Sequence, residues 1–468
     1  MSVATAVRAL PALVALGLRP APVRPVPGAS ARPAGITAAA SRPSAAQEAA
    51  AIRAAFLHAW NGYVRYAWGH DELRPLTHGW RDWYPSSLLM TPVDGYDTMV
   101  LMGLTSQADS AKRLILDSLH FDRDFPVQVF EITIRELGGL LSAYQLDGDP
   151  RFLALARDLG TRLLPAFGSP TGMPYRFVNL HTGAVSGPVS NPAEIGTLML
   201  EFGTLSKLTG DGRFYDAAKR AVMALYDRRS TIGLVGSGID VRTGAWTDPD
   251  SHVSGGIDSY YEYLLKSWLL FRDTTFERMW DSSIAAVNRY LADQRPTGFW
   301  YGHADMNTGA RTLTDFGALD AYFAAELAKS GDTVRGGRLM ASIYRMWTTW
   351  GIEPEELNYV TMQVVSPGYE LRPEALESAY YLYRITGQAR YRAMARVMVD
   401  SLFHYTRTDA GFAALASVVT KAQRDGMESY FLAETLKYAW LVFAPPRALD
   451  FDAIIFNTEA HPLRPTWR

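Results

Sequence analysis

The sequence contains no cysteine among its 468 residues. Disulfide bonds and thiolate metal sites are therefore excluded, and cysteine usage says nothing about the redox compartment. An excess of charge of one sign is also missing, since 46 Lys and Arg residues are balanced by 48 Asp and Glu residues, for a net charge of −2. This balance gives no reason to expect a nucleic-acid partner or binding to an anionic membrane.

Long hydrophobic runs are absent as well, because no stretch is apolar over the length that a bilayer requires, and we expect no membrane span. The N-terminal stretch MSVATAVRALPALVALGL resembles a weakly basic secretory signal interrupted by Pro11. The next stretch is rich in Pro, Ala, Ser and Arg, which cannot build a packed core. We therefore expect residues 1–46 to be a signal-like segment and a disordered linker, followed by a single folded domain over residues 47–468. We expect export, to the periplasm or the medium, with a cytoplasmic location as the alternative.

Three segments of the sequence resemble one another, and they span residues 141–159, 202–222 and 378–398. Each contains an apolar helical run, a glycine-centred break, an Arg with an aromatic residue, and a second amphipathic run. Glycine at the break suits the positive φ of a helix C-cap. Each segment therefore predicts an αα-hairpin.

The spacing of these hairpins predicts the architecture. Phe152 and Phe214 open the second helix of the first two segments, 62 residues apart, and a fainter copy, LLFRDTTFERMWDSSIAAV, places Phe276 another 62 residues on. Beyond residue 46 the chain accommodates about seven units of roughly 60 residues, longer than the usual solenoid repeats. This favours an all-α fold in which the helix pairs close into an α/α barrel, with long connections at one rim. Strand patterns are few, and we expect a hairpin at 233–247 and a short strand at 453–456.

Carboxylates recur where helices begin or inside aromatic helices. They are Glu131 with Arg135, Asp258, Glu374 and Glu377 beside Arg372 and Pro373, Glu428 with Glu434 in one helix, and also Asp94, Asp97 and Glu355. Several have an ordinary structural explanation: an i,i+4 ion pair for Glu131, an N-cap for Asp258, and first-turn acids after Pro373 at the first helical position. Many carboxylates with only nine His favour oxygen-ligand chemistry. Glycoside hydrolysis by a carboxylate pair and a hard-cation site of the Ca²⁺ type both fit, and they are compatible.

Seven stretches occur in the order HAWNGYVRYAWGHDELRP, VDGYDTMVLMGL, FEITIRELGGLLSAYQLDGD, GIDSYYEYLLKSWL, LRPEALESAYYLYRITG, MESYFLAETLKYAWLVF and FNTEAHPL. Together they resemble glycoside hydrolase family 47, the class I α-1,2-mannosidases, over residues 53–463. The resemblance implies an (α/α)7 barrel with a C-terminal β-hairpin plugging one end, and residues 47–468 would be its catalytic domain. The Ala- and Arg-rich composition without Cys suggests a bacterial-type member.

The resemblance also implies the activity, an inverting, Ca²⁺-dependent exo-α-1,2-mannosidase that acts on high-mannose N-glycans or related mannosides. By motif, Glu131 corresponds to the general acid and Glu374 to the general base, while Asp258 is a third central carboxylate and a further candidate acid. Thr458 corresponds to the residue that binds Ca²⁺ through its backbone carbonyl and hydroxyl. The substrate-binding positions correspond to Arg135, Arg372, Asp94, Glu355, Glu377, Glu434, Tyr430 and Glu459. His461 is expected to belong to the structure of the plug.

Some positions depart from the family pattern. Gly256 stands where branch-selective members carry Arg, which predicts a wider aglycone region and less branch selectivity. The motif TLTDF replaces HLxCF, so its His becomes Thr312. One alternative is a mannose-binding, lectin-like member with weak or no turnover, and another is a different α/α-toroid glycosidase without Ca²⁺. We expect a monomer whose partner is a mannose-containing oligosaccharide.

Overall fold

The computed structural model describes residues 43–467. Most of the expected signal-like segment and linker, residues 1–42, lies outside the described residues. The first helix, α1 (Ala45–Tyr66), begins two residues before the expected domain boundary. Ser44 and Gln47 form a capping box at its start, which satisfies backbone N–H groups that the helix leaves free.

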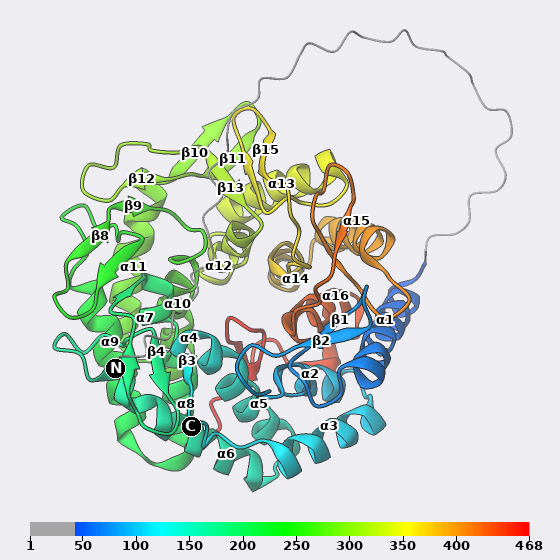
Figure 1. Ribbon diagram of the computed structural model, residues 1–468. Coiled ribbons are helices and arrows are strands. Elements are labelled where there is room, and N and C mark those ends of the chain that lie inside the picture. The colour runs from blue at the N-terminus through cyan, green and yellow to red at the C-terminus, as the bar shows by residue number, and fades with distance from the viewer. Residues whose placement is uncertain (1–42, 468) are drawn as a thin grey trace, which may run out of the picture. The chain divides into compact units, whose positions relative to one another are not determined.

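Two concentric layers of helices form a ring in the described part of the chain (Figure 1). The inner layer contains α2 (Met90–Leu101), α5 (Gly138–Asp147), α8 (Met199–Thr209), α10 (Asp258–Phe271), α12 (Phe323–Lys329), α14 (Glu374–Thr386) and α16 (Leu436–Phe443). The outer layer contains α3 (Thr105–Ser118), α6 (Pro150–Leu163), α9 (Gly212–Tyr226), α11 (Thr274–Tyr290), α13 (Thr333–Trp350), α15 (Ala389–Thr406) and α1. Because α1 packs against α16, the first and last helices close the ring. The predicted (α/α)7 barrel is confirmed.

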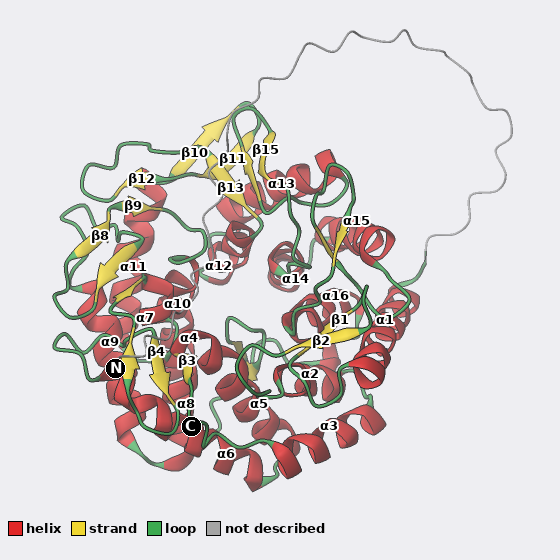
Figure 2. Cartoon of the chain, in the orientation of Figure 1, coloured by secondary structure: helices red, strands yellow, loops and turns green. Residues whose placement is uncertain are grey.

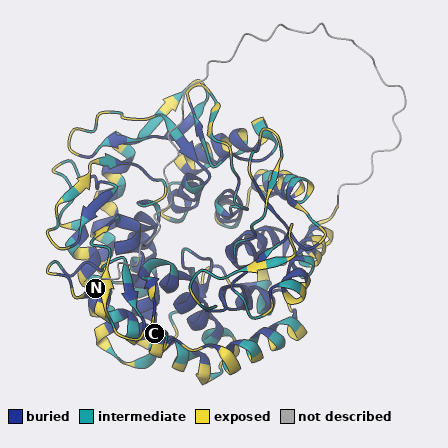
Figure 3. Ribbon diagram, in the orientation of Figure 1, coloured by how far each residue is buried: buried dark blue, intermediate teal, exposed yellow. Residues whose placement is uncertain are grey.

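The helices of the two layers differ in how much of their surface is buried. The inner helix α10 is buried on nearly all faces, whereas α11 buries one stripe that includes Phe276, Met279, Trp280 and Val287. That stripe has the i, i+3, i+4 spacing of an amphipathic helix resting on a core. Figure 3 shows the same contrast, with exposed residues gathered on the outer helices.

Short turns join the inner helices α2, α5, α8, α10, α12 and α14 to the outer helices that follow them. The predicted C-cap glycines are confirmed, since Gly148, Gly210 and Gly387 end α5, α8 and α14 with φ of 82°, 74° and 68°. A carboxylate then caps the next helix, and the N-caps of α6, α9, α11 and α13 are Asp149, Asp211, Asp273 and Asp332. Each of these side chains accepts a backbone N–H of the first turn.

The long connections run from an outer helix to the next inner helix, so they gather at the end of the ring where the inner helices begin. They carry short helical segments: α4 (Val129–Ile132), the π-helix η1 (Thr133–Leu137), η2 (Leu164–Phe167), α7 (Pro192–Gly196), η3 (Leu319–Tyr322), the π-helix η4 (Phe431–Thr435) and, after α16, η5 (Pro446–Ala448). Three of these segments, η1, η3 and η4, lead directly into the inner helices α5, α12 and α16.

Short strands occupy the same connections (Figure 2). The antiparallel sheets are β1 (Glu72–Arg74) with β2 (Gly79–Arg81); β3 (Pro126–Gln128), β4 (Phe177–Asn179) and β5 (Val185–Ser186); β6 (Val189–Ser190), β7 (Gly238–Asp240) and β8 (Trp246–Asp248); β9 (Asp250–Ser251) with β12 (Ala304–Asp305); β10 (Ala292–Arg295) with β11 (Gly298–Tyr301); β13 (Asp315–Gly317), β14 (Glu356–Asn358) and β15 (Gln363–Ser366); and β16 (Ala414–Leu415) with β17 (Gln423–Arg424). The hairpin predicted at 233–247 is the pair β7 and β8. Most of the other strands were not predicted.

The C-terminal hairpin pairs β18 (Ile455–Phe456) with β19 (Pro462–Leu463). We call residues 455–463 the plug. It is the red segment inside the ring in Figure 1, where β18 contacts α10 and β19 contacts α5. The strand predicted at 453–456 and the plugging hairpin are confirmed.

A buried ionic cluster fixes the plug to the inner helices. The His461 imidazole lies 2.7 Å from Asp97 through Nδ1 and 3.2 Å from Asp94 through Nε2. Lys437 donates to the carbonyl oxygen of Ala460 at 2.6 Å and forms an ion pair with Asp97. We call His461, Asp94, Asp97 and Lys437 the latch. As expected from the sequence, His461 belongs to the structure of the plug.

Candidate active site

A cavity of about 270 Å³ opens at the end of the ring where the inner helices begin. Helix N-termini present backbone N–H groups and favour negative charge. Eight carboxylates among the described residues line it: Glu131, Glu194, Asp258, Glu262, Glu374, Glu377, Glu434 and Glu459. The plug forms part of the lining through Thr458 and Glu459, so the cavity is bounded by helix starts and by the plug.

The cavity collects most of the residues singled out in the sequence. Those on its wall are Glu131, Asp258, Glu374, Arg135, Arg372, Glu377, Tyr430, Glu434, Thr458 and Glu459. Asp94 and Glu355 are not on the wall. Asp94 lies in the latch, 3.7 Å from Nη1 of Arg135, and Glu355 lies behind Arg372. These two carboxylates therefore hold the arginines of the cavity from behind.

Arg135 links the barrel wall to the plug. It is carried by the π-helix η1, a local widening of the helix that is frequent at functional sites. Its Nη2 atom lies 3.0 Å from Glu131, the predicted i,i+4 pair, and its Nη1 atom forms an ion pair with Glu459 of the plug. One guanidinium thus orients carboxylates from two distant parts of the chain.

Glu374 begins α14, because the residue predicted at the first helical position, Pro373, is the N-cap instead. Its Oε2 atom is buried and has no hydrogen-bond partner among the described residues. Burial raises the pKa of Glu374 to about 8, although Arg372 acts in the opposite direction. Arg372 is held by both oxygens of Glu355, at 3.0 and 3.2 Å. The site therefore contains a carboxyl group with an oxygen free to bind a ligand.

Asp258 was expected as a possible N-cap of its helix, but Ile257 takes that position and Asp258 is the first residue of α10. Its carboxylate accepts the backbone N–H of Ser259 at 2.7 Å. Burial raises the pKa of Asp258 to about 7. The hydroxyl of Tyr322 donates to its backbone oxygen at 2.8 Å, which fixes the start of the helix.

Glu262 lines the cavity and was missed in the sequence. It lies one helical turn beyond Asp258, and Lys266 lies one turn further, so an i, i+4, i+8 pattern marks this face of α10. The buried ammonium of Lys266 is 2.5 Å from Glu262 and 3.8 Å from Glu377. Lys266 therefore compensates part of the negative charge on the cavity wall.

Glu434 is carried by the π-helix η4, whereas Glu428 lies ahead of it in the chain, 3.0 Å from Arg81. The expectation that both belong to one helix is therefore wrong, because the chain becomes helical only after Glu428. Burial, reinforced by Glu459 and the other nearby acids, raises the pKa of Glu434 well above its usual range. Such mutual repulsion among buried carboxylates suits a site that receives a cation.

The sequence model described as Glycosyl hydrolase family 47 matches residues 55–465. The chain belongs to this family. It is therefore a glycoside hydrolase, in agreement with the resemblance of the seven motifs.

Relatives of the family extend over most of the chain. ER degradation-enhancing alpha-mannosidase-like protein 2 of Homo sapiens is 38% identical over 460 residues, which cover 91% of this chain and 79% of the relative. The human endoplasmic reticulum mannosyl-oligosaccharide 1,2-alpha-mannosidase is 36% identical over 451 residues, covering 88% of this chain and 63% of the relative. The solved structure of an alpha-1,2-mannosidase from Trichoderma reesei has a TM-score of 0.82 at 28% identity, covering 89% of this chain and 98% of that one. These relatives are eukaryotic, so they do not support the expectation of a bacterial-type member.

Two positions that depart from the family pattern lie in different places. Gly256 lines the cavity and has a φ of 90°, and its carbonyl accepts the N–H of Ala193 at 2.9 Å. Thr312 is not on the cavity wall, and its hydroxyl donates to Asp250 at 2.7 Å. Within residues 43–467, none of the helices is both long and apolar enough to span a bilayer.

Proposed function

We propose that this family 47 enzyme is an inverting exo-α-1,2-mannosidase of the mannosyl-oligosaccharide type, which removes terminal α-1,2-linked mannose from high-mannose N-glycans or related mannosides. The observation that carries the proposal is the convergence of Glu131, Asp258, Glu374 and Thr458 on one cavity whose inner end is formed by the plug. A cavity closed at one end admits the terminus of a sugar chain rather than its middle, which supports exo action. The names of the relatives support the linkage.

Inverting hydrolysis needs one carboxylic acid to protonate the leaving oxygen and one carboxylate to activate water on the opposite face of the sugar. We assign the base to Glu374, whose Oε2 atom is buried and free of other hydrogen bonds. The acid is either Asp258, which lines the same cavity, or Glu131, acting through a water. Arg135 holds Glu131 at 3.0 Å and keeps it oriented.

We infer that the cofactor is Ca²⁺. The donor set fits a hard cation, because Thr458 and several buried carboxylates meet at the plug end of the cavity and the described residues place no cysteine or histidine on its wall. Thr458 would bind the ion through its carbonyl and hydroxyl oxygens, with Glu377, Glu434 and Glu459 orienting its water ligands. When bound, the ion supplies a positive charge that grips sugar hydroxyls.

The remaining side chains bind and orient the sugar in this proposal. Tyr430 offers an aromatic ring, with the guanidinium carbons of Arg135 and Arg372 at 5.6 and 5.7 Å from its centroid. These arginines would also donate to sugar hydroxyls. Asp94 and Glu355 act through them, as positioning residues. Gly256 leaves room on the aglycone side, which favours low branch selectivity.

We further propose that residues 47–468 act as one monomeric catalytic domain and that residues 1–46 serve export. The secretory-pathway names of the relatives support a lumenal or exported location.

The experiment is digestion of a Man₉ glycan by the full chain, with products resolved by linkage and with and without chelator. We expect release of single α-1,2-linked mannose units, and no release after chelation. Release of internal fragments, or of mannose from other linkages alone, contradicts the proposal.

The lectin-like alternative keeps the same site and predicts mannoside binding without turnover. One relative is named for enhancing degradation rather than for hydrolysis alone, and this name is the observation that favours the lectin-like alternative. Binding of α-1,2-mannobiose measured by calorimetry, with no mannose released over days, favours it.

A further inference from the structure

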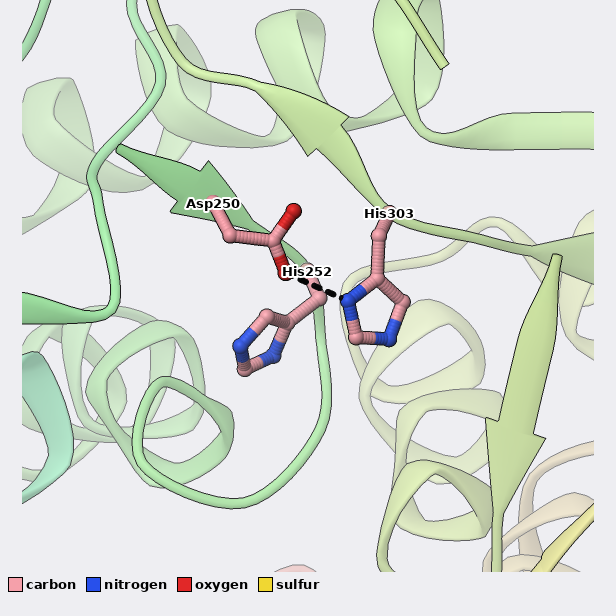
Figure 4. A group of neighbouring side chains, drawn as sticks. All are labelled: Asp250, His252 and His303. Atoms are coloured by element: carbon pink, nitrogen blue, oxygen red, sulfur yellow. Dashed lines mark hydrogen bonds and ion pairs between the residues drawn. The ribbon is translucent and has the colours of Figure 1, made fainter. Parts of the chain in front are cut away.

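A second group of chemically active side chains lies outside the catalytic cavity, in the connections between helix pairs. Strand β9 pairs with β12, so that Asp305 faces Asp250 and Ala304 faces Ser251. This register brings His252, directly after β9, beside His303, directly before β12 (Figure 4). One ligand atom from each of Asp250, His252 and His303 lies within 4.8 Å of the other two.

The three side chains are already oriented by their neighbours. The Nδ1 atom of His303 lies 2.6 Å from Oδ2 of Asp250, and the other oxygen of Asp250 accepts the hydroxyl of Thr312 at 2.7 Å. The two imidazole rings have their centroids 4.5 Å apart. His252 is buried, while the side chains of Asp250 and His303 remain 25% and 12% exposed, which leaves an approach for an ion and a water.

We propose that Asp250, His252 and His303 form a binding site for a transition-metal ion of the Zn²⁺ class. Two imidazoles and one carboxylate suit Zn²⁺, Co²⁺ or Ni²⁺, whereas Ca²⁺ and Mg²⁺ prefer oxygen ligands. Zinc bonds of about 2.0–2.2 Å place tetrahedral ligand atoms roughly 3.3 Å apart, so binding draws the side chains together. Three protein ligands leave the fourth position to water.

The protonation of the group is compatible with metal binding at neutral pH. Burial, with His303 beside it, lowers the pKa of His252 to about 4, so this ring is neutral and can offer a lone pair. The metal takes the place of the Nδ1 proton that His303 shares with Asp250, and the neutral ring then carries its proton on Nε2. Ligation through Nδ1 of His252 also replaces the 3.2 Å hydrogen bond that this atom accepts from the N–H of Ser254. Asp320 and Glu356 face His303 and add negative charge that favours a cation.

The site is connected to the wall of the catalytic cavity. Two residues beyond His252, the carbonyl of Ser254 accepts the N–H of Asp258 at 2.9 Å, and Gly255 and Gly256 line the cavity. A metal bound at His252 therefore anchors the loop that runs from the site to the start of α10. Metal binding itself does not depend on the proposed sugar chemistry.

The test is metal titration of the full chain, freed of any histidine tag, stripped with chelator and then kept in excess Ca²⁺. We expect one equivalent of Zn²⁺ to bind by calorimetry. Co²⁺ should give the visible absorption of a site with nitrogen ligands.

Variants separate a built site from adventitious binding. His252→Ala and His303→Ala should abolish binding of the Zn²⁺ equivalent. Thr312→Val removes only the hydroxyl that donates to Asp250 and should weaken the affinity for Zn²⁺ by about tenfold. His181→Ala is the matched control, because His181 pairs with Asp122 at 2.7 Å on the surface and should leave binding unchanged. Circular dichroism without metal checks folding. Absence of Zn²⁺ uptake by the parent chain, or uptake that is equal in His303→Ala and Thr312→Val, overturns the proposal.

Discussion

The ammonium of Lys437 on α16 lies 2.7 Å from the carboxylate of Asp97 on α2, and both side chains are buried. The pair is extended by His461, whose Nδ1 atom contacts the other oxygen of the same carboxylate at 2.7 Å. Asp97 thus contacts both of the cationic side chains that hold residues 455–463 in place.

Asp97→Asn should destabilise the protein by about 3–5 kcal/mol, because it removes the carboxylate paired with the buried Lys437 and one of the two carboxylates beside His461. Urea unfolding measures this loss. Lys112→Met is the control, since Lys112 forms a comparable pair with Asp147 near the surface and should cost less than about 1 kcal/mol. Equal losses in the two variants would show that the latch adds nothing beyond a surface ion pair.

The latch should also give stability a defined pH window. Lys437 and His461 outweigh burial and lower the pKa of Asp97 to about 2, so its contribution is present above its unfolded pKa of about 3.9 and is lost as pH falls through 2. The two aspartates outweigh burial and raise the pKa of His461 to about 9, so its contribution is full below about 6.5 and is lost as pH rises through 9. The difference in unfolding free energy between His461→Gln and the parent should therefore be largest between about pH 4 and 6.5 and should shrink above pH 9. A difference that grows at alkaline pH is incompatible with a charged His461.

Glu374→Gln should lower kcat by about 10²–10⁴, since it removes the proposed base and changes little in shape. Binding of α-1,2-mannobiose, measured by calorimetry, should remain. Glu136→Gln is the control, because Glu136 is a buried acid that does not line the cavity. Parallel tests of Asp258→Asn and Glu131→Gln identify the proton donor. Near-parental kcat in Glu374→Gln removes this residue from the base role.

Thr458→Val should abolish Ca²⁺-dependent activity, because it removes the hydroxyl proposed to bind the ion, whereas Thr458→Ser keeps the hydroxyl and the carbonyl and should retain most of it. Chelation with EDTA should abolish the activity of the parent enzyme, and added Ca²⁺ should restore that activity. Calorimetric titration with Ca²⁺ gives the affinity of each variant. Activity that is indifferent to chelation contradicts the proposed cofactor.

Substitutions of Arg372 and Glu355, the charged neighbours of Glu374, should shift the acidic limb of the pH profile of kcat/KM in opposite directions. Arg372 lowers the pKa of Glu374 and Glu355 raises it, against a dominant effect of burial. Since the base must be ionised, Arg372→Met should shift the limb to higher pH by about one unit or more, and Glu355→Gln should shift it to lower pH. Shifts of the same sign would mean that these groups act through structure rather than charge.

The repeat could be predicted because its signals are local. Gly148 and Gly210 mark helix ends by their backbone freedom, and the interval between them recurs between the capping residues Asp149 and Asp211. Very short strands such as β9 cannot display alternation, so the sequence could not reveal them.

The site residues also differed in whether a local sequence signal could have revealed them. Glu262 could have been found from its spacing to Asp258 and Lys266, but the aromatic character of α10 concealed it. His252 and His303 could not, because their proximity depends on the pairing of two connections from different helix pairs, for which the sequence holds no periodic signal. Helix starts were misplaced by one residue at Pro373 and Asp258, where capping and first-turn chemistry are alike.

The position of the plug near the end of the chain determines when the cavity wall is completed during synthesis. Thr458 and Glu459 come near the end of the chain and Glu131 in its first third, yet all three share one cavity wall. During synthesis, a ribosome that has released only the first six helix pairs has produced most of the ring but not the complete wall of this cavity. We therefore expect the proposed hydrolysis to begin only after the plug has left the ribosome, and we expect a product truncated before residue 455 to be inactive.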